Sequence, residues 1–263
     1  MTTSKNNTLL GIERGLSVLE AFIERSSWGL SDLARHLDLN KTVVYRIVRS
    51  LEQRGFLEQP EERGPYFLGP AAVALGRSGS SRSLLTIARR HLVRAAESTG
   101  EVALLYSMRG HRYLCVDRLD VNSDTEVTVE IGDTIGLHAG AGKSILAFQE
   151  ERFVDEVLAA PLSRYTDATP VDPDGVREML DQIRETHHWV SNGEITPNTV
   201  GISAPIRDSD GRVKYSFCLS VDANGGPLDA ARLDYLISAT VDAAASISQS
   251  LGYQEGRRIE ARF

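Results

Sequence analysis

The 263-residue sequence lacks the features that mark secreted and membrane-spanning proteins. It has only two cysteines, too few for the disulfide framework of a small secreted domain. No run of eighteen apolar residues is present, so we expect no membrane span and no membrane partner. The first ten residues are mostly polar, and Leu9 and Leu10 are far too short for the apolar core of a secretory signal. We therefore expect a soluble protein in a reducing, cytoplasmic setting.

A surplus of positive charge, common in proteins that bind nucleic acids, is also missing. The chain has 29 Lys and Arg against 36 Asp and Glu, a net charge of −7. Residues 1–76 contain nine of each sign, so the whole excess of acid lies in residues 77–263. Residues 40–54, by contrast, hold four Lys or Arg and a single Glu. Because local charge attracts the phosphate backbone, the acidic total does not exclude DNA binding.

Motifs for catalysis and metal binding are equally scarce. AGKS at residues 141–144 ends like a phosphate-binding loop, but Leu137 stands where the loop requires a glycine five residues before Gly142. The Gly-x-Ser-x-Gly motif of many hydrolases is absent, and no pair among the Cys and His residues has zinc-finger spacing. We assign no catalytic residue, no metal ligand and no cofactor, and we leave open a metal-dependent sensor.

Three helices are expected near the N-terminus. Apolar residues that recur every three to four positions predict a helix over residues 11–24. Its repeating positions are Ile12, Leu16, Leu19 and Ile23, and Val18 and Phe22 widen the stripe. Ser31 is expected to cap a second helix, and Asp38 to adopt a positive φ in the tight turn that follows. Asn40 then caps a third helix that stops at Gly55, which completes a helix-turn-helix pattern.

The third helix has one apolar and one polar face. Its inner stripe is formed by Val44, Ile47, Val48 and Leu51. The opposite side carries the residues that we expect to contact DNA, which are Lys41, Thr42, Tyr45, Arg46 and Arg49. Such a helix fits the major groove, where its N-terminal half reaches base edges and Arg and Lys meet phosphates or guanine. The alternative for the same pattern is a solvated charged face on a small helical bundle.

A hairpin is expected directly after this helix. Residues 56–59 and 65–68 are strand-like, and the intervening segment 60–64 contains Pro, Glu and Gly. The hairpin would be the wing of a winged helix, and Arg63 at its tip is a further candidate contact to phosphate or to the minor groove. Together these features predict double-stranded DNA as a partner and a DNA-binding domain over residues 1–76.

The rest of the chain predicts a larger α+β domain. Residues 70–76 can form a short helix, and the small, polar segment 77–83 is typical of a linker into a second domain over residues 84–263. Strands are expected over residues 102–108, 113–119, 126–131, 200–206 and 213–221. Helices are expected over residues 84–98, 143–149, 152–159, 174–187 and 229–251. Strands flanked by helices in mixed order are typical of an α+β sensor domain.

Several short motifs resemble the IclR family of bacterial transcriptional regulators, over nearly the whole chain. Besides the helix-turn-helix, they are GPYFLG at 64–69, IG at 131–132, LHAGAGK at 137–143 and ISAPIRD at 202–208. The resemblance implies an N-terminal all-α winged helix-turn-helix domain and a C-terminal α+β, GAF-like effector domain with a mixed or antiparallel sheet. It also implies a homodimer or tetramer and a small-molecule effector, often an organic or aromatic acid.

The resemblance also places eight residues around the effector. They are Val127, Gly140, Ala141, Ser191, Thr199, Gly201, Cys218 and Ser220. The chemistry of this set suits an acid. Gly140 and Ala141 precede a helix, where backbone N–H groups favour a carboxylate. The hydroxyl groups of Ser191, Thr199 and Ser220 can orient a ligand.

The leading interpretation is a ligand-responsive transcriptional regulator and not an enzyme. Two copies paired through the N-terminal region would place their recognition helices about one DNA turn apart, on an imperfect inverted repeat. Two other functions stay open. The first is a small-acid hydrolase or nucleotide-dependent enzyme with an accessory winged helix. The second is an interaction module whose winged helix binds protein.

Overall fold

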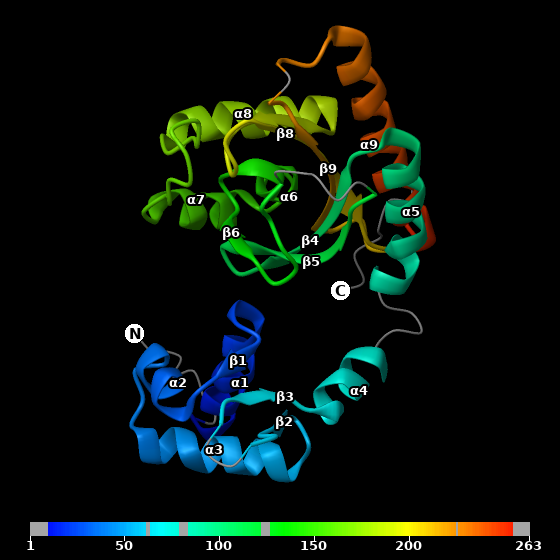
Figure 1. Ribbon diagram of the computed structural model, residues 1–263. Coiled ribbons are helices and arrows are strands. Elements are labelled where there is room, and N and C mark those ends of the chain that lie inside the picture. Colours follow the sequence, from blue (N-terminus) through cyan, green and yellow to red (C-terminus); the bar gives the residue numbers. More distant parts are fainter. Residues whose placement is uncertain (1–9, 62–63, 79–83, 122–126, 225, 255–263) are drawn as a thin grey trace, which may run out of the picture. The chain divides into compact units, whose positions relative to one another are not determined.

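The computed structural model describes residues 10–61, 64–78, 84–121, 127–224 and 226–254. It divides into two compact units, residues 1–81 and residues 82–263, and each unit has its own core. Figure 1 labels the helices and strands of both units.

The N-terminal unit consists of helices around a small antiparallel sheet. Its elements are α1 (Leu10–Glu24), β1 (Ser27–Trp28), α2 (Leu30–His36), α3 (Lys41–Gln53), β2 (Leu57–Glu58), β3 (Tyr66–Leu68) and α4 (Pro70–Ser78). The strand order is β1–β3–β2, and β2 pairs with β3 in antiparallel fashion. The expected wing hairpin is therefore confirmed, and β1 adds a third strand that the sequence did not indicate.

Local backbone chemistry produces the helix-turn-helix. Asp38 has the expected positive φ, 50°, and Gly55 follows the end of α3 with a φ of 72°. The Asn40 side chain accepts a hydrogen bond from a backbone N–H in the first turn of α3, so the predicted cap is also confirmed. Val44 and Val48 are wholly buried in the core of the unit. These contacts fix α3 with its opposite face outward.

The expected start of α2 is wrong. The helix begins at Leu30, one residue before Ser31, and Gly29 occupies the cap position without a side-chain hydrogen bond. Gly29 has an extended backbone, and its carbonyl oxygen accepts the hydrogen bond of Leu33 N at 3.0 Å. The first turn therefore closes on the backbone alone, and Ser31 lies inside it.

The apolar residues of α1 lie on two faces, although the sequence suggested a single stripe. Val18 and Phe22 are buried in the core. Ile12, Leu16 and Ile23 are 59, 54 and 40% exposed. Spacing of three to four residues indicates which side chains share a face, but not which face meets the core. The second face leaves an apolar surface uncovered in a single copy of the chain.

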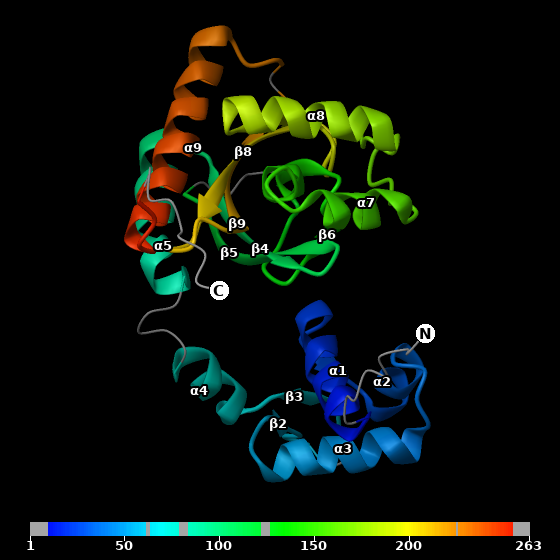
Figure 2. The ribbon, with the colours of Figure 1, turned by 180° about the vertical axis from the view of Figure 1, so that it is seen from behind.

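The second unit is an antiparallel sheet with helices on both faces. Its elements are α5 (Leu84–Thr99), β4 (Val102–Arg109), β5 (Arg112–Leu119), β6 (Thr134–Gly136), η2 (Gly140–Gly142), α6 (Lys143–Leu146), α7 (Glu151–Ala159), α8 (Pro173–Thr186), β7 (Trp189–Asn192), β8 (Thr199–Arg207), β9 (Val213–Asp222) and α9 (Ala230–Ser250). Within the described ranges the strand order is β6–β5–β4–β9–β8–β7, with antiparallel neighbours throughout. Figure 2 shows α5 and α9 on one face and α6, α7 and α8 on the other. The expected α+β class is confirmed.

Each face of this sheet has its own apolar core, because side chains alternate along a strand. In β4, Ala103 and Leu105 contact the core under α5 and α9, whereas Leu104 and Tyr106 belong to the core under α6, α7 and α8. The first of these cores also receives Val200, Ile202, Ala204 and Ile206 from β8. No helix in the described parts of the chain is long and apolar enough to cross a membrane.

The strand expected over residues 126–131 is wrong. Residues 127–130 form no strand, and two of their carbonyl groups accept hydrogen bonds from a side chain instead. Arg118 Nη1 donates hydrogen bonds to Val127 O at 2.9 Å and to Val129 O at 2.5 Å. Backbone acceptors need a partner, but that partner need not be a strand. The sheet edges are instead β6 and β7, which were not expected, while the other expected helices and strands are present with ends shifted by a few residues.

Candidate DNA-binding groove and effector cavity

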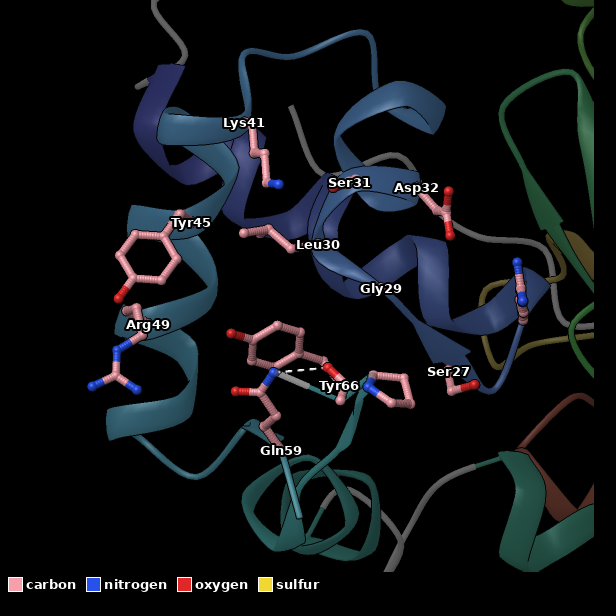
Figure 3. Close-up of a pocket in the computed structure, with 13 residues that line it drawn as sticks. Ser27, Gly29, Leu30, Ser31, Asp32, Lys41, Tyr45, Arg49, Gln59 and Tyr66 are labelled. Atoms are coloured by element: carbon pink, nitrogen blue, oxygen red, sulfur yellow. Dashed lines mark hydrogen bonds between the residues drawn. The ribbon is translucent and has the colours of Figure 1, made fainter. Parts of the chain in front are cut away.

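A groove of about 910 Å³ in the N-terminal unit is lined by α3, by the wing and by residues between positions 25 and 32 around the start of α2. Lys41, Tyr45 and Arg49 lie along one wall on successive turns of α3, as Figure 3 shows. Gln59 and Tyr66, from the wing, line the end of the groove near Arg49, and the start of α2 lines the side opposite α3. The spacing of four residues along the wall repeats about once per helical turn, so these three side chains form a single row.

The predicted contact residues of α3 are all exposed, but they divide between two sides. Lys41, Tyr45 and Arg49 face the groove, whereas Arg46 lines a second depression of about 460 Å³ between α3 and α1. Thr42 is four residues before Arg46 and shares its side of the helix. The remaining predicted contact, Arg63, lies outside the described residues.

Two charged residues of the groove, Arg49 and Asp32, form partly exposed and therefore weak ion pairs. Arg49 Nη1 lies 2.6 Å from Glu52 Oε2, and Asp32 Oδ1 lies 3.1 Å from Arg35 Nη1. Ion pairs this exposed contribute about 0–1 kcal/mol. Arg49 can therefore exchange its carboxylate partner for a phosphate at little cost.

Two wing residues that the sequence did not single out complete the groove. Gln59 Nε2 donates a hydrogen bond to Gly64 O at 2.7 Å, which ties the two sides of the hairpin together. Tyr66 is only 3% exposed, and burial raises the pKa of its hydroxyl group, with a smaller contribution from the charge of Glu52. A lone Gln or Tyr at a strand position has no distinctive spacing, so the sequence carried no signal for either.

A small cavity lies between the sheet of the second unit and two covering segments, residues 127–129 and residues 194–196. It measures about 30 Å³, room for about two water molecules. All the residues expected around the effector line it, namely Val127, Gly140, Ala141, Ser191, Thr199, Gly201, Cys218 and Ser220. The fold thus brings together side chains from segments that are far apart in the sequence.

Strand alternation explains why these residues meet. In β8 and β9 the large apolar side chains face α5 and α9, so Thr199, Gly201, Cys218 and Ser220 fall on the opposite face. In register, Gly201 lies between Ser191 of β7 and Ser220 of β9. The result is a patch of small and polar side chains in an otherwise apolar core.

Two glycines leave room at the cavity wall. Gly140 has a φ of 53°, and a Cβ added there would lie 2.9 Å from both the Tyr113 hydroxyl oxygen and Ile195 Cγ1. A Cβ added at Gly201 would lie 2.8 Å from Ser191 Oγ. At Gly140 both the positive φ and these contacts disfavour a side chain, whereas at Gly201 a Cβ would require the Ser191 hydroxyl group to rotate away.

A buried ion pair that the sequence did not indicate lies beside the cavity, which only its acidic member lines. Glu194 lines the cavity and accepts hydrogen bonds from Gly140 N at 2.8 Å and from Trp189 Nε1 at 3.1 Å. Lys143 Nζ pairs with the same carboxylate and lies 4.8 Å from the centre of the Trp189 ring. Burial lowers the pKa of the wholly buried Lys143, and Glu194 opposes that shift. The Gly140 N–H that we expected to meet a ligand is thus occupied by a carboxylate of the chain itself.

The resemblance of residues 141–144 to a phosphate-binding loop has a structural explanation. Lys143 is held by Glu194, and the Ser144 hydroxyl oxygen lies 2.8 Å from that of Ser203. Both serines are buried. The two residues that would bind phosphate and metal in such a loop are therefore buried and bonded to other residues of this unit.

Comparison with known protein families decides the classification. The family described as "Bacterial transcriptional regulator IclR C-terminal" matches residues 77–249, and the "IclR helix-turn-helix domain" matches residues 11–61. The chain belongs to the IclR family of transcriptional regulators. The family resemblance stated from the sequence is thereby confirmed, and the match to residues 11–61 covers α3 and the row formed by Lys41, Tyr45 and Arg49.

Curated members of the IclR family align over most of their length. The HTH-type transcriptional regulator BhcR of Paracoccus denitrificans (strain Pd 1222) is 31% identical over 90% of this chain and 85% of its own. The HTH-type transcriptional repressor AllR of Escherichia coli (strain K12) is 27% identical over 92% of this chain and 90% of its own. Both relatives are named as transcriptional regulators.

Solved IclR structures share the fold. The IclR transcriptional regulator from Alicyclobacillus acidocaldarius has a TM-score of 0.85 at 23% identity, over 93% of this chain and 100% of its own. An IclR homologue from Microbacterium hydrocarbonoxydans, complexed with 4-hydroxybenzoate, has a TM-score of 0.80 at 24% identity, over 92% and 98%. The winged helix-turn-helix followed by an α+β domain is therefore the fold of IclR regulators.

Proposed function

We propose that this IclR-family chain is a ligand-responsive regulator that binds an inverted-repeat operator as a homo-oligomer. Residues 1–76 read the DNA, residues 84–263 bind a small organic acid, and residues 77–83 connect the two. The observation that carries the proposal is the row formed by Lys41, Tyr45 and Arg49 on one wall of the groove beside the wing. A row of cationic and hydrogen-bonding side chains on an exposed helix suits the major groove.

Exposed apolar surface supports pairing through the N-terminal unit. Ile12 and Leu16 belong to the uncovered face of α1, and Val73 and Leu75 of α4 are 58 and 63% exposed. Covering such surface with a second copy gains about 25 cal/mol per Å² of apolar area. Pairing of identical faces creates two-fold symmetry, which matches an inverted repeat with half-sites roughly 34 Å apart.

The cavity supports a small acid as the effector. Ser191, Thr199 and Ser220 bring hydroxyl groups to it, and Cys218 brings a thiol. Its volume of about 30 Å³ is far below the roughly 300–1,000 Å³ of pockets for drug-sized ligands. An aromatic acid such as the 4-hydroxybenzoate of the Microbacterium relative would require a larger displacement of the covering segments than a two- or three-carbon acid. Effector binding would then bias the spacing or orientation of the paired α3 helices.

A gel-shift titration with DNA upstream of the chain's own gene and of the neighbouring gene tests the DNA-reading role. The double variant Arg46→Ala plus Arg49→Ala should weaken binding at least tenfold and flatten the dependence of affinity on salt, because phosphate contacts are lost. The matched control is Arg152→Ala plus Arg212→Ala, which removes two exposed arginines of the second unit. Equal affinity of both double variants would contradict the assignment of α3 as the recognition helix.

A thermal-shift screen of small carboxylic and aromatic acids tests the effector-binding role. An acid present at a hundred times its Kd should stabilise the protein by about 2.7 kcal/mol. If no acid shifts the unfolding midpoint, the sensor role of the cavity loses its support.

A further inference from the structure

Three hydrogen-bond donors converge on the side chain of Glu194, which lines the cavity, and one of the three, Gly140, lines it as well. The Gly140 N–H and the Lys143 ammonium both donate to Oε2, and the Trp189 indole N–H donates to Oε1. A backbone amide, a cation and an indole amine around one carboxylate are the groups with which a protein binds a carboxylate ligand. Here the carboxylate belongs to the chain.

The negative charge of Glu194 is already balanced by the positive charge of Lys143. Glu194 is 6% exposed and Lys143 is wholly buried, so both lie in a medium of low dielectric constant. The other titratable groups that line the cavity are Tyr106, Tyr113 and Cys218, which burial keeps neutral by raising their pKa values. A second carboxylate that entered beside Glu194 would therefore meet one cation shared between two anions, which is strongly unfavourable.

Glu194 lies on a segment that can respond to such a ligand. Residues 194–196 all line the cavity and lie outside the strands. The Thr196 hydroxyl oxygen lies 2.8 Å from that of Thr128, in the other covering segment. Thr169 Oγ1 donates to Glu194 O at 2.6 Å, and Thr199 Oγ1 donates to Thr196 O at 2.8 Å. The segment that carries Glu194 is thus tied through hydroxyl groups to Thr128, Thr169 and Thr199.

We infer that Glu194 is an internal occupant of the effector's carboxylate position, and that an acidic effector binds by displacing the Glu194 carboxylate from Gly140, Lys143 and Trp189. The exchange leaves the number of anions beside Lys143 unchanged, because one carboxylate replaces another. It also enlarges the cavity, because the displaced side chain and its segment leave it. The regulatory role of this exchange rests on the proposed function. The anion site itself rests on the hydrogen bonds that Glu194 accepts.

Acetate binding to Glu194→Ala tests the anion site directly. The Trp28→Phe background leaves Trp189 as the single tryptophan, since the chain has two, and its fluorescence then reports the site. Glu194→Ala should bind acetate at least tenfold more tightly than the Trp28→Phe parent. Glu97→Ala removes an exposed glutamate of α5, on the other face of the sheet, and should leave acetate binding unchanged. Lys143→Met combined with Glu194→Ala should lose the gained affinity.

Glu194→Gln keeps the shape of the side chain and provides a second test if Glu194→Ala does not fold. An acid that stabilises the unsubstituted chain in a thermal-shift screen should bind Glu194→Gln at least tenfold more tightly. If neither variant folds alone, recovery of folding by acetate supports the inference, and failure of saturating acetate to restore folding contradicts it.

Two results would overturn the inference. One is that folded Glu194 variants bind acetate no better than their parent, which makes the ion pair purely structural. The other is that an acid binds Glu194→Gln and the unsubstituted chain equally well, which places its carboxylate elsewhere. Neither measurement uses DNA, so a failure of the DNA-binding proposal remains separate from a failure of this one.

Discussion

The side chain of Asn40 accepts a hydrogen bond from Thr42 N at 2.9 Å, which closes the start of α3. The backbone of Asn40 is extended, with a φ of −60° and a ψ of 133°, so the helix begins at Lys41. This bond sets where the row formed by Lys41, Tyr45 and Arg49 on α3 starts.

Asn40→Ala should lower the stability of the N-terminal unit by about 1 kcal/mol, because a backbone donor of the first turn loses its partner. Operator affinity should fall as well, because Lys41 and Thr42 lie in that turn. Denaturant unfolding followed by circular dichroism measures the first effect, and a DNA titration the second. Asn40→Ser is the control, since serine caps helices equally well, and a loss as large as that of alanine would count against the capping role.

Gly140→Ala should destabilise the second unit by more than its backbone conformation alone explains. A positive φ costs an alanine about 1–2 kcal/mol, and contacts of 2.9 Å with Tyr113 and Ile195 add roughly 1–3 kcal/mol. Gly110→Ala is a matched control, because Gly110 has a φ of 55° and no atom within 4 Å of the added Cβ. Equal unfolding free energies for the two variants would contradict the tight contact at the cavity wall.

The two cysteines should be unreactive in the folded protein. Burial raises the pKa of both the Cys115 and Cys218 thiols to about 12, which lowers the thiolate fraction at pH 8 about a thousandfold. The folded-state pKa lies above the unfolded value of about 9. The resulting stabilisation is therefore complete below pH 9 and is lost as the pH rises from 9 toward 12. Thiol titration with a disulfide reagent at pH 8, before and after unfolding, checks this, and rapid reaction of the folded protein would contradict it.

Leu16→Glu should disrupt pairing through the N-terminal unit. A charge in the uncovered apolar face of α1 disfavours its burial against a second copy, whereas the face is solvent-exposed in one copy. Size-exclusion chromatography with light scattering should show a smaller mass, and operator affinity should fall at least a hundredfold. Ile131→Glu, at a residue 58% exposed in the second unit, is the control. An unchanged mass for Leu16→Glu would show that the pairing interface does not include this face of α1.

Local signals in the sequence predicted the N-terminal unit well. Asn40 and Asp38 act through their own backbone neighbourhood, so their roles follow from residue type and position. The burial of α1 was harder to predict, because its apolar periodicity fits both the core side and the face with Leu16. The sequence of one chain does not indicate which apolar face of a helix is buried in the core and which is buried between copies.

Long-range contacts explain what the sequence missed in the second unit. The cavity positions on β8 and β9 followed from the family resemblance, and strand alternation accounts for them. The Lys143–Glu194 pair joins residues 51 positions apart, and no periodicity relates them. The prediction of a strand around Val127 was wrong because Arg118, from another segment, binds the carbonyl groups of Val127 and Val129.

The most direct test of the account is the coupling between the cavity and the groove. Operator affinity is measured by fluorescence anisotropy with and without a saturating acid found by thermal shift, and the affinity for that acid is measured with and without operator DNA. For a ligand-responsive regulator, acid and DNA should change each other's Kd by the same factor, at least fivefold in either direction, because linkage is reciprocal. Operator affinity that stays the same at saturating acid would contradict a ligand-responsive regulator.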